Sequence, residues 1–247
     1  MVSKAFLKYV KSLQLKKNRD KEGDFVLEGS KNLLELIDSD FEIIKLLCTK
    51  TFFTTNEAKL SKLSGVVSVT DQQIIESAGS FKTNNAGLAV VRMNSGTITA
   101  NLNEWIIALD RVQDPGNLGT IIRTADWFGI RHIICSPDTV DVYNPKVINA
   151  TMGSFARVKV HYGKLNLFFD KLQLPVFGAL LEGKPLNSVK TDGNGIILMG
   201  NESRGISDEL LDIIDFPVFI PRVGEAESLN VAIATGILCA HFCISDL

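Results

Sequence analysis

Three segments of the 247-residue chain join polar side chains to tight turns, and each follows an apolar run. In the first, residues 109–129, a turn at Pro115 and Gly116 leads into a helical stretch that carries Asn117 and Arg123. Free N–H groups at the start of a helix can bind an anion. The planar guanidinium of an arginine can bond two oxygens of one phosphate. A surface arginine on an ordinary helix explains this spacing equally well.

The second segment, residues 197–207, ends an apolar run at Gly200 and turns through Glu202 and Gly205 before a helix expected at Ser207. Glycine permits backbone angles and close approaches that a Cβ would block, so an adenine or ribose could lie against this main chain. The segment lacks the Lys-Ser/Thr pair of a P-loop, and no Gly-x-Gly-x-x-Gly follows an expected strand. A plain strand-to-helix loop is the alternative.

The third segment, residues 219–242, passes from Ile220 through a loop into a long apolar helix that we expect to begin near Ser228. Ser228 is a natural N-cap, and Leu229 and Asn230 then stand where helix N–H groups are free. A cofactor could meet both the polar side chains and those N–H groups. A capped core helix is the alternative.

The elements that position these segments alternate between strand and helix along the chain. Alternation of this kind predicts a parallel sheet covered on both faces, with ligands at the carboxyl ends of its strands. Strands are expected within 25–29, 41–49, 66–70, 87–93, 104–110, 132–135, 155–160, 176–181, 195–200 and 218–222. Helices are expected at 3–15, 30–37 (capped by Ser30), 56–63, 71–79, 117–128, 145–152, 166–172 and 228–243.

A polar stretch at 95–103 predicts a linker between two α/β domains, residues 1–94 and 104–247. The front domain carries 14 basic and 11 acidic residues, although the whole chain has a net charge of −2. Seven of its basic residues fall within residues 1–22. Such a cluster attracts polyanions or simply forms a solvated helix face. If RNA is bound, we expect contacts from Lys11, Lys16, Lys17 and Arg19.

Composition excludes several classes of protein. With 45% hydrophobic and 22% charged residues, the chain is typical of a globular protein. It has no apolar run of 18 residues and no signal-peptide pattern, so we expect a cytoplasmic protein without a membrane span. The four cysteines form no CxxC pair and there are three histidines, so we expect no metal site.

Taken together, the three segments resemble motifs 1, 2 and 3 of the SpoU (TrmH-like) branch of the SPOUT RNA methyltransferases. Motif 1 is matched at Asn117, Arg123, Thr124, Ala125 and Gly129, and motif 2 at Gly200, Glu202, Gly205 and Ser207. Motif 3 is matched at Ile220, Pro221, Gly224, Ser228, Leu229, Asn230, Val231 and Ala234. Residues 11–37 also resemble the substrate-binding domain of rRNA-modifying members, which is similar to small ribosomal RNA-binding proteins.

The resemblance implies transfer of a methyl group from S-adenosylmethionine (AdoMet) to a ribose 2′-hydroxyl of structured RNA. It implies a parallel-sheet catalytic domain with a deep trefoil knot, acting as a homodimer without a metal. It places cofactor contacts at Leu180, Gly200, Ile220, Ser228, Leu229 and Asn230. It gives catalytic roles to Asn117, Arg123, Glu202 and Asn230.

Arg123 takes the position of an arginine proposed as the base in this family. Because the pKa of arginine exceeds 12, we favour phosphate clamping for Arg123 and leave the proton acceptor open. By the same resemblance, Arg157 could contact RNA, or it is simply a charge at a strand edge. The long front domain favours large-subunit rRNA over tRNA. The alternatives are a tRNA methyltransferase, a non-catalytic RNA-binding ribosome-assembly protein on this fold, and an unrelated nucleotide-binding enzyme.

Overall fold

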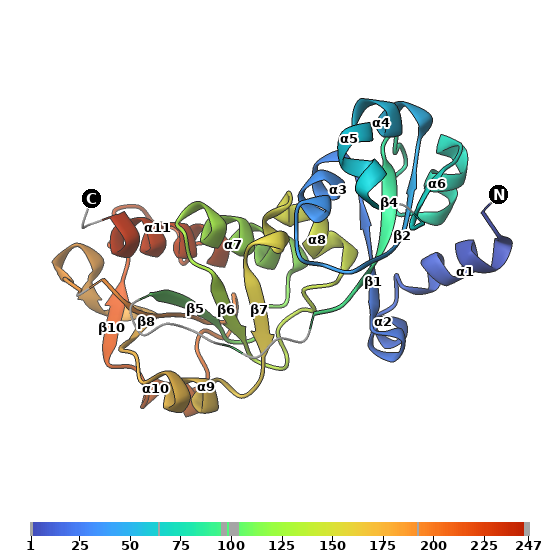
Figure 1. Cartoon of the computed structure of the whole chain (residues 1–247). Helices are drawn as coiled ribbons and strands as arrows, with labels where there is room; N and C mark the ends of the chain where they lie inside the picture. The colour runs from blue at the N-terminus through green and yellow to red at the C-terminus, as the bar shows by residue number, and fades with distance from the viewer. Residues whose placement is uncertain (1, 64, 95–97, 99–103, 192, 245–247) are drawn as a thin grey trace. The chain divides into compact units, whose positions relative to one another are not determined.

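The computed structural model describes residues 2–63, 65–94, 98, 104–191 and 193–244 (Figure 1). Contacts divide the chain into two units. Unit 1 comprises Met1–Ser95 and Asp141–Ala156, and unit 2 comprises Gly96–Val140 and Arg157–Leu247. Of the predicted 95–103 linker, only Ile98 lies within the described residues. Residues 141–156 group with the front of the chain, although in sequence they lie inside the predicted 104–247 domain.

Unit 2 is built on a six-stranded sheet in the order β10-β8-β9-β5-β6-β7, and every neighbouring pair is parallel. The predicted parallel sheet is therefore confirmed. Its strands are β5 (Trp105–Leu109), β6 (His132–Cys135), β7 (Lys159–Tyr162), β8 (Val176–Pro185), β9 (Gly195–Met199) and β10 (Phe216–Phe219). The central strands β5 and β9 are buried along their whole length. This is why they read as continuous apolar runs.

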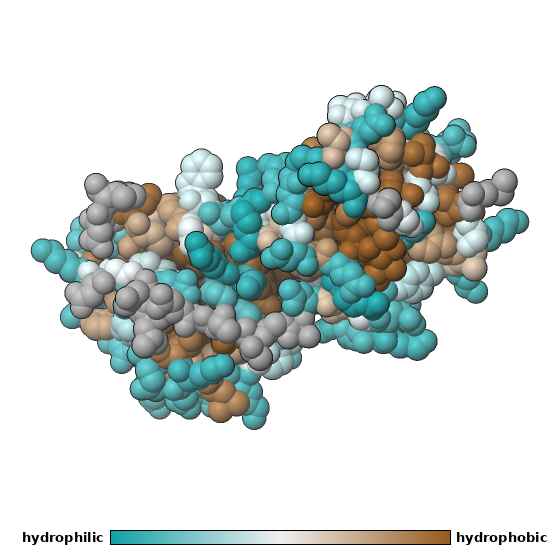
Figure 2. All heavy atoms as spheres, in the orientation of Figure 1, coloured by the Kyte–Doolittle hydropathy of each residue, from teal (hydrophilic) through white to brown (hydrophobic). Residues whose placement is uncertain are grey.

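Helices cover both faces of this sheet (Figure 1). They are α7 (Pro115–Trp127), α9 (Leu165–Leu172), α10 (Asp208–Leu211) and α11 (Val231–Ile244), and a short 3₁₀ turn forms at η3 (Leu186–Ser188). Leu165 of α9 and Leu210 of α10 pack with Ile106 of β5 in one core. On the other face, Phe242 of α11 stacks on Trp105 with ring centroids 5.0 Å apart. The side of α11 turned to the viewer in Figure 2 is tan to brown, so part of this helix leaves apolar side chains at the surface.

Unit 1 holds a four-stranded sheet in the order β1-β4-β2-β3, in which the β1–β4 and β4–β2 pairs are antiparallel and the β2–β3 pair is parallel. The parallel arrangement expected from the alternation of strands and helices therefore holds for unit 2 and not for unit 1. Its strands are β1 (Asp24–Glu28), β2 (Ile43–Cys48), β3 (Val67–Val69) and β4 (Gly87–Arg92). Its helices are α1 (Lys4–Ser12), α2 (Lys16–Glu22), α3 (Ser30–Ile37), α4 (Lys50–Thr55), α5 (Glu57–Leu60), α6 (Gln72–Ala78) and α8 (Pro145–Thr151), with 3₁₀ turns η1 (Ser61–Leu63) and η2 (Ser154–Ala156). Alternate residues of β1 feed two cores, because successive side chains of a strand point to opposite faces. Phe25 and Leu27 enter one core, and Val26 enters the other.

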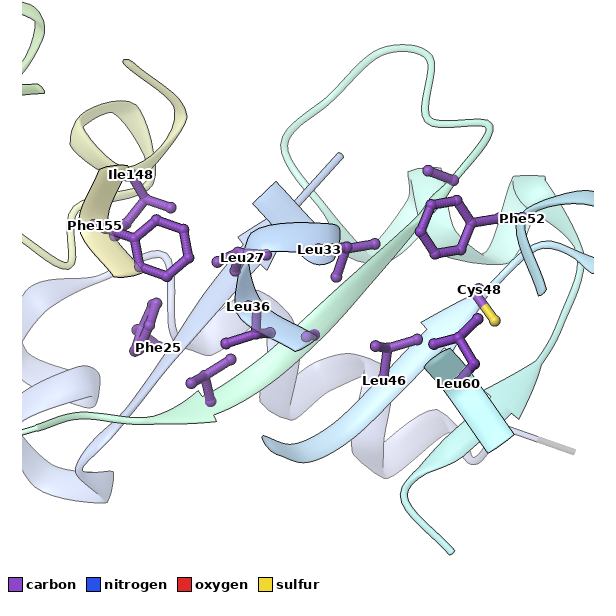
Figure 3. Close-up of a cluster of buried hydrophobic side chains, with 13 residues drawn as sticks. Phe25, Leu27, Leu33, Leu36, Leu46, Cys48, Phe52, Leu60, Ile148 and Phe155 are labelled. Atoms are coloured by element: carbon purple, nitrogen blue, oxygen red, sulfur yellow. The ribbon is translucent and has the colours of Figure 1, made fainter. Parts of the chain in front are cut away.

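The first of these cores extends beyond the front of the sequence. Ile148 of α8 and Phe155 of η2 pack into it beside Phe25 and Leu36 (Figure 3). Both residues are at most 5% exposed. Residues 141–156 are thus a structural part of unit 1.

Several predicted elements need correction. Ser30 is the first residue of α3, and Gly29, with φ 88°, occupies the N-cap because this backbone angle favours glycine. The last helix begins at Val231 rather than Ser228. Residues 154–156 form a 3₁₀ turn, so only part of the predicted strand at 155–160 is extended. The helices α2 and α4 were not predicted. The trefoil knot stays a prediction.

Candidate functional site

Four loops lie at the carboxyl edge of the unit 2 sheet. They follow β5, β9, β8 and β10, which are consecutive neighbours in the strand order. Because parallel strands end at the same edge, their loops meet there. The three segments singled out by their chemistry follow β5, β9 and β10.

The segment after β5 begins α7 with a defined cap. The Asp114 carboxylate accepts a hydrogen bond from the Asn117 N–H at 2.8 Å, and Pro115 occupies the first helical turn. Proline is favoured there because its fixed φ suits a helix and it has no N–H to satisfy. The cap holds Asn117 in the first turn, at the edge where the other loops arrive.

A chain of three side chains links the three segments. Asn230 Nδ2 donates to Asn117 Oδ1 at 2.9 Å, and Asn117 Nδ2 donates to Glu202 Oε1 at 2.8 Å. At its far end, Asn230 Oδ1 accepts from the N–H of Ala232 at 2.9 Å. The structure therefore brings together three of the four predicted catalytic residues. In sequence, Glu202 lies 85 positions and Asn230 lies 113 positions after Asn117.

The hydrogen bonds that link Asn230, Asn117 and Glu202 all donate in the same direction. A helix N–H can meet only the oxygen of Asn230, and an ionised carboxylate can meet only the NH₂ of Asn117, so both amide orientations are fixed by their partners. Asn230, not Ser228, caps α11. The chain thus runs from the positive end of the α11 dipole to the negative charge of Glu202.

Arg123 lies outside this chain. It is exposed on α7 and makes no hydrogen bond or ion pair with any described residue. Six residues along an α-helix correspond to about 9 Å and a rotation of about 120° from Asn117. A free guanidinium in that position is available to an external anion.

The loop after β9 closes on its own backbone. Asn201 and Gly205 exchange main-chain hydrogen bonds of 2.9 Å, and Asn201 Oδ1 accepts from the N–H of Ser203 and Arg204. A Cβ on Gly200 would stand 2.3 Å from the carbonyl carbon of Gly205. Only glycine fits at position 200, because the backbone of Gly205 and Ile206 fills the space that a Cβ would need. The close approach at this glycine is therefore made by the loop itself, and contact of an adenine or ribose with this main chain stays a prediction.

Strand β8 loses its register with β10 beside this loop. Pro217 pairs with Gly178, but the next residue, Val218, pairs with Lys184. Residues 179–183 are left out of the ladder. They include Leu180, which is half-buried, as is Ile220 at the end of β10.

The loop 221–230 is exposed at every position. Among the described residues, none of the N–H groups at 222–229 donates a hydrogen bond. Ser228 and Leu229 lie here, with the Leu229 side chain 48% exposed.

These features fit a cofactor such as AdoMet. Its adenine needs apolar side chains against its faces and main-chain groups at its edge. Leu180, Ile220 and Leu229, which are half-buried or exposed, would supply the apolar side chains. The free main chain of 222–229 would supply donors, and Gly200 lets the loop after β9 pack tightly on its own backbone beside them. No ligand geometry is implied by this fit.

The basic residues predicted to bind RNA separate into two groups. Lys11, Lys16 and Lys17 are exposed at the end of α1 and the start of α2. Arg19 is only 2% exposed, and its Nη2 contacts Asp141 Oδ2 at 2.6 Å. Its Nη1 donates to the carbonyl oxygens of Leu13 and Gln14. Arg19 is therefore a structural residue in unit 1 that does not share the lysine surface.

Arg157 is held by a carboxylate of its own unit. Its Nε and Nη2 both donate to Asp126, at 2.9 and 2.8 Å. Asp126 also lies on α7, and the pair joins that helix to the segment before β7. An RNA phosphate that contacts Arg157 would have to share the guanidinium with Asp126 or displace Asp126 from it.

Burial disfavours the thiolate form of all four cysteines. All four are free thiols, and burial raises the pKa of Cys48 and Cys243 to about 11. Burial raises the pKa of Cys135 and Cys239 further still. No three His, Cys, Asp or Glu side chains in the described part of the chain gather as a metal site would require. None of the described helices could span a membrane.

Residues 104–240 match the family model described as the SpoU rRNA methylase family, and residues 4–86 match the MRM3-like substrate binding domain. The chain belongs to the SpoU rRNA methylase family. The SpoU segment contains every residue of the Asn117–Glu202–Asn230 chain, and the second match covers most of unit 1.

Relatives of this SpoU protein match it over nearly their whole length. One is the 23S rRNA (guanosine(2553)-2′-O)-methyltransferase RlmP of Bacillus subtilis, 29% identical over 94% of this chain and 93% of its own. A solved structure described as a TrmH-family RNA methyltransferase of Porphyromonas gingivalis is 34% identical, covers 99% of both chains and has a TM-score of 0.87. The AdoMet-bound rRNA methyltransferase of Sinorhizobium meliloti is 29% identical over 100% of this chain and 98% of its own, with a TM-score of 0.89.

Two residues of this SpoU site were missed in the sequence. Asp110 ends the apolar β5 run, is buried, and accepts from the N–H of Ser207 at 2.8 Å. Asn201 donates to the carbonyl oxygen of Arg111 at 2.8 Å. An acid directly after a continuous apolar strand was the available signal for Asp110. Asn201 gave no signal, because its side-chain contacts with Arg111, Ser203 and Arg204 form only in the folded loop.

Proposed function

We propose that this protein transfers a methyl group from AdoMet to a ribose 2′-hydroxyl of large-subunit rRNA. The observation that carries the proposal is the directed chain from Asn230 through Asn117 to Glu202, which joins the three SpoU motifs at one edge of the sheet. RlmP, the relative that is named for 23S rRNA methylation, supports the choice of substrate. We propose that the protein works in the cytoplasm, where its rRNA substrate is found.

Reaction requires a ribose hydroxyl to be oriented and relieved of a proton. When bound, AdoMet supplies an electrophilic methyl group. Glu202 Oε1 is occupied by Asn117, while Oε2 bonds no described residue and can accept the ribose hydroxyl. Asn230 and Asn117 hold that carboxylate in place, and α11 offsets its charge.

Arg123 clamps a substrate phosphate next to the reacting ribose. It is exposed and unpaired within the described residues, and its planar fork matches two phosphate oxygens. Leu180, Gly200, Ile220, Ser228 and Leu229 hold the cofactor, for the reasons of shape and free main chain given above. Lys11, Lys16 and Lys17 give unit 1 a basic surface for RNA backbone.

We further propose a homodimer. Ile233, Ile237 and Ile244 are all at least 37% exposed and recur at helical spacing on α11. Trp127, at the end of the contacting helix α7, is 84% exposed. A stripe of this kind is unusual on a monomer, and a second copy of the chain would cover it. Ile237→Lys should convert a dimer to a monomer in light scattering; a wild-type monomer contradicts the proposal.

The test of function is transfer of labelled methyl from AdoMet to unmodified large-subunit rRNA and to bulk tRNA in parallel. Arg123→Ala should lose most of the activity and keep its cofactor affinity. Arg131→Ala is the matched control, because Arg131 is an exposed arginine of unit 2 that precedes β6 at the opposite edge of the sheet. Label in tRNA alone would overturn the choice of substrate. Bound cofactor without label in either RNA would favour a binding protein.

A further inference from the structure

Arg111 has an unusual backbone. Three described residues other than glycine have positive φ: Arg111 at 58°, Met152 at 52° and Gln173 at 51°. Met152 and Gln173 are the C-caps of α8 and α9, where the left-handed conformation is an ordinary way to end a helix. Arg111 follows a strand and ends no helix. A side chain in this region carries strain that persists only where the surroundings fix it.

The surroundings fix Arg111 from both sides. Its N–H donates to Ser136 Oγ, which follows β6, at 2.8 Å. Its carbonyl oxygen accepts from Asn201 Nδ2, which follows β9, also at 2.8 Å. Since β5 lies between β9 and β6 in the sheet, both neighbours of the strand hold the residue that comes after it.

The guanidinium is fixed at one end and open at the other. Nε lies 3.3 Å from the buried Asp110 Oδ1 but forms no hydrogen bond. The two Nη groups are not buried and bond no described residue, and the side chain as a whole is 27% exposed. Asp110 also accepts from Ser207, so its position does not depend on Arg111. The guanidinium of Arg111 is therefore held in one orientation, and its Nη1 and Nη2 groups each keep two N–H donors that bond no described residue.

The position of Arg111 argues for a substrate anion rather than a cofactor anion. The residues proposed to hold AdoMet lie within β8 or follow β9 and β10. Arg111 follows β5, one strand farther toward β6, and comes six residues before Asn117. It shares the β5–α7 segment with Arg123, the proposed phosphate clamp.

We propose that Arg111 binds a backbone phosphate of the RNA substrate, and that its left-handed backbone is retained to aim the guanidinium at that phosphate. This inference rests on the proposed function. A glycine would adopt this positive φ without strain. The strain of an arginine at this position is therefore offset by a contact that its side chain makes.

The test compares Arg111→Gly with Gln173→Gly. Both variants place glycine at a positive φ, and Gln173 is exposed at the end of α9, outside the site. Gln173→Gly should not lower the Tm, whereas Arg111→Gly also loses the ion pair with the buried Asp110, so both variants are assayed at a temperature where thermal unfolding shows them folded. Arg111→Gly should raise the KM for unmodified large-subunit rRNA about tenfold and leave the AdoMet Kd within twofold. Loss of one phosphate contact should also reduce the slope of log Kd for RNA against log salt by about 0.7–0.9.

The outcomes separate the two proposals. A wild-type protein that methylates no RNA overturns both. An active wild type with an unchanged KM and salt slope in Arg111→Gly overturns the role of Arg111 alone. A weaker AdoMet Kd with an unchanged salt slope assigns Arg111 to the cofactor and also overturns it. Arg111→Lys should keep the salt slope but recover only part of the KM, because an ammonium lacks the fork.

Discussion

The substitution Asn230→Asp removes one hydrogen bond of the Asn230–Asn117–Glu202 network by replacing one donor group with an oxygen. The substitution keeps Oδ1, so the N–H groups of Ala232 and Ile233 keep their acceptor, and Asp caps a helix as well as Asn does. It removes the NH₂ that donates to Asn117 Oδ1. The Asn117 amide must then turn its own NH₂ to the new carboxylate and give up Glu202.

The magnitude follows from that lost contact. A hydrogen bond to a charged group contributes about 1.5–3 kcal/mol, and the exposure of Glu202 places this one at or below the lower end. About 1.4 kcal/mol of transition-state stabilisation corresponds to about tenfold in rate. Asn230→Asp should therefore reduce kcat/KM about tenfold and leave the Tm nearly unchanged.

The assay is labelled methyl transfer to unmodified rRNA, with thermal unfolding measured on the same samples. Asn230→Ala is the matched variant, because it removes the cap as well. It should lose about 1 kcal/mol of stability and about 2–4 °C in Tm in addition to the activity. Full activity in Asn230→Asp would refute the reasoning, since the chain would then be irrelevant to catalysis. A large fall in its Tm would show that the contact is structural.

Three further changes test other parts of the structure. Gly200→Ala should abolish AdoMet binding in titration calorimetry, because its Cβ would meet backbone at 2.3 Å; binding within twofold of wild type would contradict the close approach. Burial lowers the pKa of His132, which lies 3.1 Å from His161. The unfolded chain therefore binds more protons below pH about 6.5, and the wild-type Tm should fall from pH 7 to 5 more steeply than that of His132→Asn; parallel curves would exclude this linkage. Changing the exposed Lys11, Lys16 and Lys17 to Glu should weaken RNA binding most at low salt. A loss of binding that does not depend on salt would indicate misfolding. The control is the same change at three exposed lysines elsewhere in unit 1: Lys31, Lys62 and Lys82.

Sequence reasoning succeeded where local pattern and tertiary structure agree. The apolar runs of β5 and β9 are buried on both faces, so their composition alone predicts central strands. The helix α2 was missed because its sequence, KKNRDKE, has no apolar period. It is held by the buried Arg19 and ends at Gly23 in a left-handed conformation, and neither feature has a helical pattern.

The candidate site divides in the same way. Spacing alone gave no reason to join Asn117 to Asn230. The resemblance to SpoU motifs placed both in one site, and the hydrogen bond between them is a finding of the structure. Choosing Ser228 as the cap applied a correct preference to the wrong residue, because Asn230 is an equally good cap and also reaches Asn117. Arg19 looked like its lysine neighbours until the fold provided Asp141, 122 residues later.

The contribution of residues 141–156 to the core of unit 1 has a consequence for synthesis on the ribosome. When residue 95 has been added, Phe25 and Leu36 still lack Ile148 and Phe155, their later partners. Chains grow at about 5–20 residues per second, so those partners follow some seconds later. During that interval the nascent front of the chain presents an incomplete apolar face to chaperones. Unit 1 is therefore expected to complete its folding only after β6 has been synthesised.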